Sequence, residues 1–295
     1  MRRALPIALL ALSTLGAIAT AAAVLVERPR WEAYDRADEL VSKAQELSGR
    51  GDIRGAHAAV EEALAIAPDD PRARRENGLQ LLAAGQREEA LAELKAVAKA
   101  LPYDAGAARE LGVLLATMGD VKAGIGWLRK AVSLQPGNGI IHTLLAGYLL
   151  QAGQSQQAGR EAELGAKLAP QVRLAQSSLG LARWKSGDRE GAISAFNRTL
   201  ALSPSDVPTL LCLAGVTGEL HRRDEAIGYL QRALEIAPGN ATGWTALGAA
   251  YLADNRRSEA ERAFREALKL DLNEPGAKAG VQKLAEQQRR AGGER

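Results

Sequence analysis

Apolar side chains along this chain recur with helical spacing, in pairs of short segments that polar and turn residues separate. The pattern is clearest near the C-terminus, where the first stripe is Trp244, Leu247, Ala250 and Tyr251 and the second is Ala260, Phe264 and Ala267. Steps of three and four residues place such side chains on one face of an α-helix. We therefore predict two short helices that pack on each other, with small residues at the close contacts.

The helical pairs recur with a fixed period of 34 residues. Prolines mark the period most clearly, at Pro68, Pro102, Pro136, Pro170, Pro204 and Pro238. Glycines follow the same step, at Gly51, Gly85, Gly119, Gly153 and Gly187. A segment of this length is too short to bury a core alone, so each copy must cover its apolar face with its neighbours. The sequence thus predicts a solenoid whose function lies on a long shared surface and not in one catalytic cleft.

Counting back from each of the six prolines, and adding one further step of 34 residues, gives seven contiguous repeats. Their bounds are 37–70, 71–104, 105–138, 139–172, 173–206, 207–240 and 241–274. In each repeat we expect the first helix to end near the recurrent glycine, where a left-handed residue stops a helix, and the second to end before the proline. His221 and Asn255 replace that glycine in the last two repeats, and both residue types tolerate a positive φ better than most.

Residues 275–295 follow the array, and we expect them to form a capping helix with a short tail. Their apolar stripe consists of Ala277, Val281, Leu284 and Ala285, and polar residues occupy most of the other positions. An array of repeats needs such a half-polar helix, because its last repeat would otherwise leave an apolar face uncovered.

The repeat resembles the tetratricopeptide repeat, whose signature is W-x2-L-G-x2-Y, then small–aromatic–small, then proline. The seventh repeat carries it as Trp244, Leu247, Gly248, Tyr251, Ala260, Phe264 and Ala267. Other repeats keep parts of the signature, and the fourth has His142 at the tryptophan position. The resemblance covers residues 37–274. It implies an all-α fold, a right-handed α-α superhelix (a TPR solenoid) whose concave wall is lined by the first helix of each repeat.

The resemblance also implies which side chains meet a partner, because the fifth, ninth and twelfth positions of each repeat line the concave wall. From these positions we predict a partner-binding groove that contains Arg75, Leu79, Arg109, Val113, Thr143, Ser177, Leu181, Trp184, Leu211 and Thr245. A wall so rich in apolar and small residues suits an extended or helical protein segment with apolar anchors.

Two kinds of residue in this groove leave two interpretations open. Arg75 and Arg109 either pair with acidic groups of a bound segment or are neutralised by Glu76 and Glu110, which follow them in the chain. Trp184 either anchors a partner, as exposed tryptophans often do, or is partly buried against the next repeat.

A run of 23 uncharged residues, 4–26, follows the basic start of the chain. It is long enough to cross about 30 Å of hydrocarbon as a membrane anchor. It also contains small-x-small sites of the kind that ends a cleaved secretory signal. We favour the anchor within the segment 1–30, because the run stays apolar through Val26, although eight of its residues are alanine. Either interpretation places the repeats on the extracytoplasmic side, the periplasmic side in bacteria.

Residues 31–36 are expected to be a juxtamembrane linker between that run and the first repeat. Trp31 and Tyr34 both lie in this segment. Amphipathic rings favour the headgroup region of a membrane, but both rings could equally pack on the first repeat. The sequence leaves these two positions for the aromatic side chains open.

The charge of the chain is concentrated at its N-terminus. The sequence has 38 basic and 35 acidic residues, of which four basic and one acidic lie within residues 1–30, leaving 34 of each sign elsewhere. Proteins that bind nucleic acid need a basic surface that tracks the phosphates. A neutral array therefore predicts no nucleic-acid partner.

Residues with distinctive chemistry are few and scattered. Cys212 is the single cysteine and lies in an apolar helical run, so we expect a buried thiol and no disulfide. His57, His142 and His221 belong to different repeats, which predicts no metal site. No glycine-rich phosphate loop is present, so no cofactor is expected. These features predict a protein that is not an enzyme.

Taken with the apolar start, these features predict a membrane-tethered, non-enzymatic scaffold. Its groove would bind a protein or peptide outside the cytoplasm. The alternative is a periplasmic component of polysaccharide assembly or export, in which Trp184 would stack on sugar rings. The sequence does not identify the partner.

Overall fold

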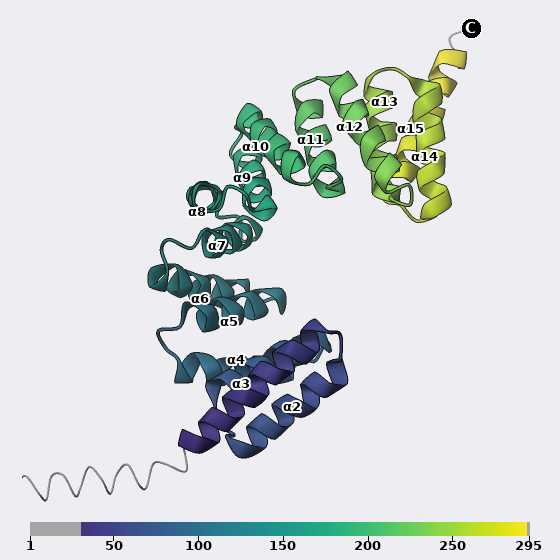
Figure 1. Ribbon diagram of the computed structural model, residues 1–295. Helices are drawn as coiled ribbons and strands as arrows, with labels where there is room; N and C mark the ends of the chain where they lie inside the picture. The colour runs from purple at the N-terminus through teal and green to yellow at the C-terminus, as the bar shows by residue number, and fades with distance from the viewer. Residues whose placement is uncertain (1–30, 294–295) are drawn as a thin grey trace, which may run out of the picture. The chain divides into compact units, whose positions relative to one another are not determined.

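The structure, a computed structural model, describes residues 31–293. All regular elements between these residues are α-helices joined by short turns (Figure 1). Residues 31–49 form the first helical stretch. The helices that follow are α2 (Ile53–Ile66), α3 (Pro71–Ala83), α4 (Arg87–Ala100), α5 (Ala105–Thr117), α6 (Val121–Leu134), α7 (Gly139–Gln151), α8 (Ser155–Leu168), α9 (Arg173–Lys185), α10 (Arg189–Leu202), α11 (Val207–Glu219), α12 (Arg223–Ile236), α13 (Ala241–Ala253), α14 (Arg257–Leu270) and α15 (Pro275–Gly293). The prediction of two helices per repeat is confirmed.

The described chain divides into two compact parts. The N-terminal part ends at Leu134 and holds the pair of 31–49 with α2, then α3 with α4 and α5 with α6. The C-terminal part begins at Gln135 and holds four pairs, from α7 with α8 to α13 with α14, followed by α15. Within each part, the helices of a pair pack on each other, and the second helix also packs on the first helix of the next pair. Each repeat thus buries its apolar face against its neighbours.

Left-handed residues end the first helix of each repeat, as the sequence predicts. The five recurrent glycines have φ between 73° and 101°. His221 and Asn255, which stand at the same place in the last two repeats, have φ of 59° and 60°. A positive φ directs the chain away from the helix axis and starts the return helix. The substitution of glycine by His and Asn is therefore a tolerated change, with the same backbone geometry.

Side-chain caps fix the start of most first helices. The carboxylate of Asp104, for example, accepts a hydrogen bond from the backbone N–H of Ala107 at 2.8 Å, and Asn240 caps α13 through the N–H of Gly243 at 2.9 Å. A cap of this kind satisfies one of the donors that the first turn of a helix leaves unpaired. The capping residue in the short loop after each proline therefore determines where the first helix of the next repeat begins.

The two helices of a pair approach closely where a glycine faces a large side chain. A Cβ on Gly180 would lie 2.5 Å from Cδ1 of Phe196, and one on Gly248 would lie 2.6 Å from Cδ1 of Phe264. Both rings are buried. Glycine in the first helix therefore creates the space that the ring of the second helix fills, which is how interiors reach their close packing.

Helix α15 covers the end of the C-terminal part. Ala277 and Leu284 are buried, and Val281 packs on the same cluster as they do. Ala285, which the sequence places on the buried stripe, is exposed. Gly280 lies there instead, because its missing side chain lets α15 approach the ring of Phe264.

The first described residues are helical where a linker was expected. Residues 31–36 belong to the same helix as 37–49. Tyr34 packs on the first buried cluster, and its hydroxyl donates to Oδ1 of Asp69 at 2.7 Å, whereas Trp31 is 68% exposed. The predicted anchor, residues 4–26, lies outside the described residues. Between residues 31 and 293 no helix combines the length and apolar character that a membrane crossing requires.

Candidate functional site

The predicted groove residues lie on the first helices of their repeats, and we call their surface the first-helix wall. In the N-terminal part it consists of Arg75 and Leu79 on α3 with Arg109 and Val113 on α5. In the C-terminal part it consists of Thr143 on α7, Ser177, Leu181 and Trp184 on α9, Leu211 on α11 and Thr245 on α13. Within the C-terminal part α7 contacts α9, and α9 contacts α11. The first helices α7, α9 and α11 therefore form a continuous layer.

Arg75 is held inside the N-terminal part by two carboxylates, Asp104 at the end of its own repeat and Glu110 in the next repeat. Its Nε donates to Oε2 of Glu110 at 2.7 Å, and its Nη2 donates to Oδ1 of Asp104 at 3.4 Å. Burial alone would raise the pKa of Asp104, but the N–H of Ala107 and the charge of Arg75 outweigh it and hold that pKa below its ordinary value. Arg75 therefore joins two repeats, and its charge is already compensated.

Glu76 does not neutralise Arg75, although it is adjacent in the chain. Its carboxylate accepts instead from Nε2 of Gln45 in the preceding repeat, at 3.1 Å. Arg109 contacts the remaining oxygen of Glu110 at 3.2 Å and is 36% exposed at its side chain. Of the two wall arginines in the N-terminal part, Arg109 is thus the one that a partner can reach. Leu79 is also accessible, with 39% of its surface exposed.

Three apolar wall residues of the C-terminal part come together. Leu181, Trp184 and Leu211 all pack, half-buried, on the buried cluster around Phe196. A Cβ on Gly215 would lie 2.7 Å from Cη2 of Trp184, so the indole covers the next first helix closely. The structure therefore places Trp184 partly against the next repeat, with its remaining surface on the wall.

The indole N–H of Trp184 is also engaged. It donates to Oε1 of Glu219 at 3.0 Å, and Arg189 donates to the other oxygen of that carboxylate at 2.7 Å. The bond from Arg189, followed by the bond from Trp184, lowers the pKa of Glu219 below its ordinary value. These contacts fix the orientation of the Trp184 ring.

The three hydroxyl residues of the wall do not offer their hydroxyls to a partner. Thr143 is 2% exposed and donates to the carbonyl of Gly139, and Ser177 donates to the carbonyl of Leu174. The Thr245 hydroxyl is buried without a hydrogen-bond partner among the described residues. The hydroxyls of Thr143 and Ser177 are turned back onto their own helices, and the place of these residues in a groove stays a prediction.

Sequence reasoning missed a small cavity on the same layer, of about 250 Å³. Tyr148 and Leu174 line it together with Thr143, between α7 and α9. Burial raises the pKa of the Tyr148 hydroxyl. Tyr148 occupies the tenth position of its repeat. The groove prediction used only the fifth, ninth and twelfth positions, so it did not include this residue.

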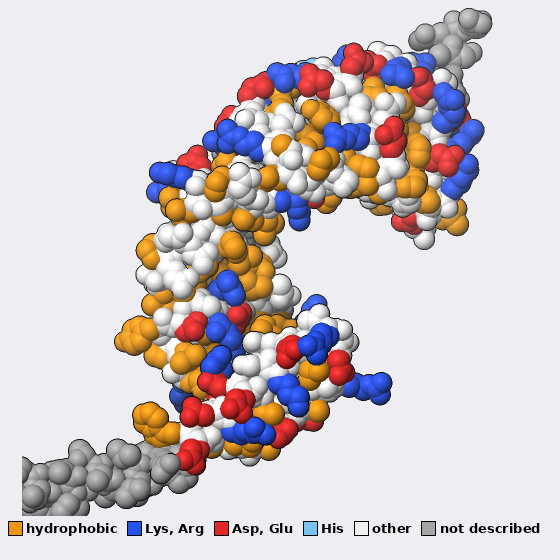
Figure 2. Space-filling model, in the orientation of Figure 1, with side chains coloured by type: hydrophobic (Ala, Val, Ile, Leu, Met, Phe, Trp, Pro, Cys, Tyr) orange, Lys and Arg blue, Asp and Glu red, His pale blue; other side chains and the backbone are white. Residues whose placement is uncertain are grey.

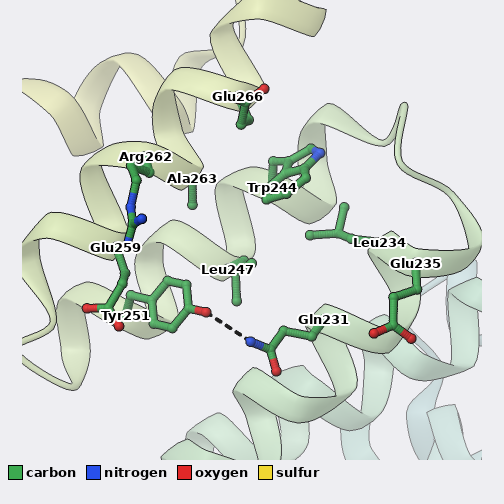
Figure 3. Close-up of a pocket in the computed structure, with 10 residues that line it drawn as sticks. All are labelled: Gln231, Leu234, Glu235, Trp244, Leu247, Tyr251, Glu259, Arg262, Ala263 and Glu266. Atoms are coloured by element: carbon green, nitrogen blue, oxygen red, sulfur yellow. Dashed lines mark hydrogen bonds between the residues drawn. The ribbon is translucent and has the colours of Figure 1, made fainter.

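A larger pocket of about 690 Å³, which we call the Trp244 pocket, lies between α12, α13 and α14 (Figure 3). Its lining consists of Gln231, Leu234, Glu235, Trp244, Leu247, Tyr251, Glu259, Arg262, Ala263 and Glu266. The sequence assigns the α13 members to the packing signature of the repeat. Core residues and pocket residues share the same helical spacing, so no signal in the sequence separates the two.

Hydrogen bonds fix the aromatic side chains of this pocket. The hydroxyl of Tyr251 accepts from Nε2 of Gln231 at 3.0 Å, the contact drawn in Figure 3. The guanidinium of Arg256 lies 4.5 Å from the centre of the Tyr251 ring, as a cation–π pair. The indole N–H of Trp244 donates to the carbonyl of Pro238 at 2.9 Å. Both rings are therefore held in place without a ligand.

Metal-binding and nucleophilic residues are scattered through the described chain. Between residues 31 and 293 no three His, Cys, Asp or Glu side chains converge as metal ligands would. Cys212 is half-buried, and burial raises the pKa of its thiol, which disfavours the reactive thiolate. On the face of residues 31–49 and α2 that Figure 2 shows, acidic and basic side chains are interspersed.

Family models of the tetratricopeptide repeat match residues 75–139, 142–207 and 206–273. These matches fall on the helix pairs described above. The chain belongs to the tetratricopeptide repeat family, and seven repeats of this kind are consistent with the structure.

Curated relatives match over shorter stretches. The Hsp70-Hsp90 organizing protein of Triticum aestivum is 29% identical over 102 residues, which are 35% of this chain and 18% of that protein. The general transcriptional corepressor ssn6 of Schizosaccharomyces pombe is 33% identical over 81 residues, 28% of this chain and 7% of that protein. The chain thus spans less than a fifth of the length of these relatives.

Solved structures share the fold. Cut9-Hcn1, a hetero-tetramer of the APC/C, matches with a TM-score of 0.68 and 19% identity over 82% of this chain and 48% of that one. Pseudomonas aeruginosa pilF matches with a TM-score of 0.63 and 19% identity, over 72% and 97% of the two chains. A tetratricopeptide repeat protein from Parabacteroides merdae matches with a TM-score of 0.64 and 14% identity, over 85% and 99%. At these identities the likeness to the solved structures shows the fold.

Proposed function

We propose that this chain is a non-enzymatic scaffold that binds a polypeptide segment along the first-helix wall. The observation that carries the proposal is the joint placement of Leu181, Trp184 and Leu211 on neighbouring first helices. Half-buried apolar side chains that are held rigid by the core beneath them are suitable anchors, because little side-chain entropy is lost on binding.

We further propose that residues 4–26 tether the scaffold to a membrane, with the repeats on the extracytoplasmic (periplasmic) side. The support is the length of the uncharged run, which reaches Val26 without interruption. If the run is instead removed as a signal, the same repeats would be secreted or periplasmic and soluble. The binding proposal is the same in both cases.

Photocrosslinking tests the wall directly. Full-length protein with p-benzoylphenylalanine in place of Leu181 is irradiated in cells of the source organism, and crosslinked products are identified by mass spectrometry. The matched control carries the same residue in place of Glu163, an exposed position on α8. We expect one dominant polypeptide crosslink at position 181 and its absence at position 163.

A second variant, Arg109→Glu, tests whether the reachable arginine contributes. We expect it to weaken polypeptide binding by the N-terminal part several-fold, because it reverses a charge on that part of the wall. Arg75 is unsuitable for this purpose, since its loss would leave Glu110 and Asp104 without their partner. Retention of polysaccharide alone, with no polypeptide crosslink, would favour the role in polysaccharide assembly or export.

Cell fractionation tests the tether. We expect the chain to sediment with membranes, to need detergent for release, and to keep residues 1–30. Deletion of residues 4–26 should make it soluble or retain it in the cytoplasm. A mature chain that starts between Thr20 and Val24 and is released by osmotic shock would instead establish the cleaved signal.

A further inference from the structure

The Trp244 pocket opens on a different face of α13 from the first-helix wall. Thr245, the wall residue of α13, follows Trp244 directly, and one residue turns a side chain by about 100° around a helix axis. Trp244, Leu247 and Tyr251 extend into the space between α12 and α14, as Figure 3 shows. Both of these neighbours are second helices of their repeats. The pocket therefore belongs to the second-helix side of the array.

The floor of the pocket is apolar. Leu234 of α12, Trp244 and Leu247 of α13 and Ala263 of α14 face it. These four side chains belong to the last hydrophobic cluster or pack on it, so the floor is anchored in the core. At about 690 Å³ the pocket is large enough for one or two side chains of a ligand, within the usual range of binding pockets.

The rim of the pocket carries three carboxylates, of which one is uncompensated. It carries Glu235, Glu259 and Glu266 against one basic residue, Arg262. Glu259 accepts two hydrogen bonds from Arg256, and Glu266 accepts one from Lys269 at 2.6 Å. Glu235 is exposed and makes no hydrogen bond or ion pair with any residue of the described chain. An uncompensated carboxylate beside an apolar floor attracts a ligand that combines a cation with an apolar group.

The preceding repeat differs from the last one at a side chain that stands beside this pocket. There Nη2 of Arg232 donates to the carbonyl of Pro204 at 2.5 Å, so this side chain lies against the turn that corresponds to Pro238. Glu266 stands 34 residues later, at the same position of the repeat. It cannot donate to a carbonyl, and Trp244 donates to Pro238 instead. The exchange of arginine for glutamate removes a side chain that would lie against the proline turn and places a carboxylate on the rim of the pocket.

We infer that the Trp244 pocket is a second polypeptide-binding site, for a short segment with an aliphatic side chain next to Lys or Arg. The aliphatic side chain would pack on the Trp244 indole and Leu247, and the cation would pair with Glu235. This site is separate from the first-helix wall, so the inference does not depend on the proposed function of that wall. It gives the scaffold one binding surface on each side of the C-terminal part.

Fluorine NMR on the full chain labelled with 5-fluorotryptophan tests the inference. The sequence has four tryptophans, and the Trp244→Phe variant assigns the Trp244 resonance. The probes are two acetylated, amidated peptides, Ala-Leu-Lys-Leu-Lys-Ala and its counterpart with both lysines replaced by glutamate. We expect the lysine peptide to shift the Trp244 resonance saturably and to leave the Trp127 and Trp184 resonances in place. The glutamate peptide should cause no saturable shift.

Two variants and a matched control identify the groups responsible. Glu235→Lys is expected to weaken binding of the lysine peptide at least about tenfold, by reversing the uncompensated charge. Glu266→Arg, which copies Arg232 of the preceding repeat, should close the pocket and abolish the shift. Glu163→Lys makes the same charge change as the first variant on the exposed face of α8 and should bind as the original chain does. Circular dichroism and retention of all four resonances establish that each variant is folded.

The possible outcomes are distinct. A shift of the Trp184 resonance alone would support the first-helix wall as the site and overturn the Trp244 pocket. Equal binding of the two peptides, an unchanged affinity in Glu235→Lys, or no saturable shift of Trp244 with either peptide would each also overturn it. Loss of the crosslink at position 181, with peptide binding at Trp244 intact, would overturn the proposed wall and leave this inference standing.

Discussion

Four different residue types occupy the fourth position of the repeat, and each donates a hydrogen bond to the backbone carbonyl of the recurrent proline six residues before it. The bonds run from Arg74 to Pro68 at 2.8 Å, from His142 to Pro136 at 2.9 Å, from Gln176 to Pro170 at 3.1 Å and from Trp244 to Pro238 at 2.9 Å. The carbonyl of that proline lies in the turn two residues beyond a second helix, where the side chain supplies its donor. A residue with a suitable N–H therefore satisfies the position, whether or not it is tryptophan.

His142 illustrates why the departure from the family signature is tolerated. It is buried, its Nε2 faces the Pro136 carbonyl, and its Nδ1 lies 2.6 Å from Oε2 of Glu161. The sequence shows only that histidine stands in the tryptophan position. The partners come from the preceding turn and from the second helix, so the role of the ring follows from packing and not from the local pattern.

Replacement of His142 by leucine should destabilise the protein. The change removes the donor to the Pro136 carbonyl and leaves Glu161 without its partner, which we expect to lower the free energy of unfolding by about 1–3 kcal/mol. His142→Gln, which copies Gln176 of the next repeat, should retain more stability because it can still donate to the carbonyl. Urea unfolding followed by circular dichroism measures both variants. Equal losses for leucine and glutamine would show that the carbonyl bond contributes nothing.

At the scale of helices, close approach depends on glycines that face large side chains across a pair. The ring of Phe264 lies between Gly248 of α13 and Gly280 of α15. A Cβ at either glycine would lie within 2.6 Å of the Phe264 ring. Protein interiors have little free volume to absorb such a clash, so one ring fixes both helices. The last helix of the array is attached by the same device that holds its repeats together.

Substitution of Gly280 by alanine should therefore loosen α15. The added methyl group would clash with Phe264, and we expect a loss of about 1–3 kcal/mol in the free energy of unfolding. Hydrogen exchange should also become faster in α15, because the helix must move away from α14. Gly228→Ala is the matched control, since its Cβ would meet nothing within 4 Å and alanine favours a helix. Unchanged exchange in α15 of the Gly280 variant would show that Phe264 does not position the helix.

The sequence predicts the helices well and the side-chain contacts between them less well. Helix ends follow from local signals, the recurrent glycine and the capping residue, which are read within a few positions. Arg75 pairs with Glu110 and not with the adjacent Glu76. Which carboxylate it meets depends on how α3 and α5 face each other, because the two residues are 35 positions apart in the sequence. The Trp244 pocket could not be predicted either, because it depends on how side chains of three different helices, α12, α13 and α14, are placed relative to each other.

At the scale of the whole molecule, each compact part has buried clusters of its own. In the C-terminal part these clusters lie between consecutive helix pairs, and α15 covers the last one. Repeat proteins draw most of their stability from contacts between neighbouring repeats. The C-terminal part thus contains, within itself, the kinds of contact that stabilise an array.

The C-terminal part, residues 135–295, should fold when it is expressed alone. We expect a helical circular dichroism spectrum and a cooperative urea transition, with a smaller denaturant dependence than the full chain because less surface is exposed on unfolding. The control is the same fragment ended after Leu272, which lacks α15 and should unfold at lower urea. A fragment 135–295 without helical signal would show that the C-terminal part depends on the rest of the chain.

The uniform turns and caps of the repeats have a consequence for how the chain can change in length. First helices of 13 residues and second helices of 14 alternate from α3 to α14, so removal of residues 173–206 would join α8 to α11 through the same kind of loop. Removal of half a repeat would instead place two first helices in succession, with their small residues facing no large partner. Such a scaffold can therefore gain or lose whole repeats by recombination during evolution, and its binding surface grows or shrinks with them. The loops and caps between the remaining repeats stay the same.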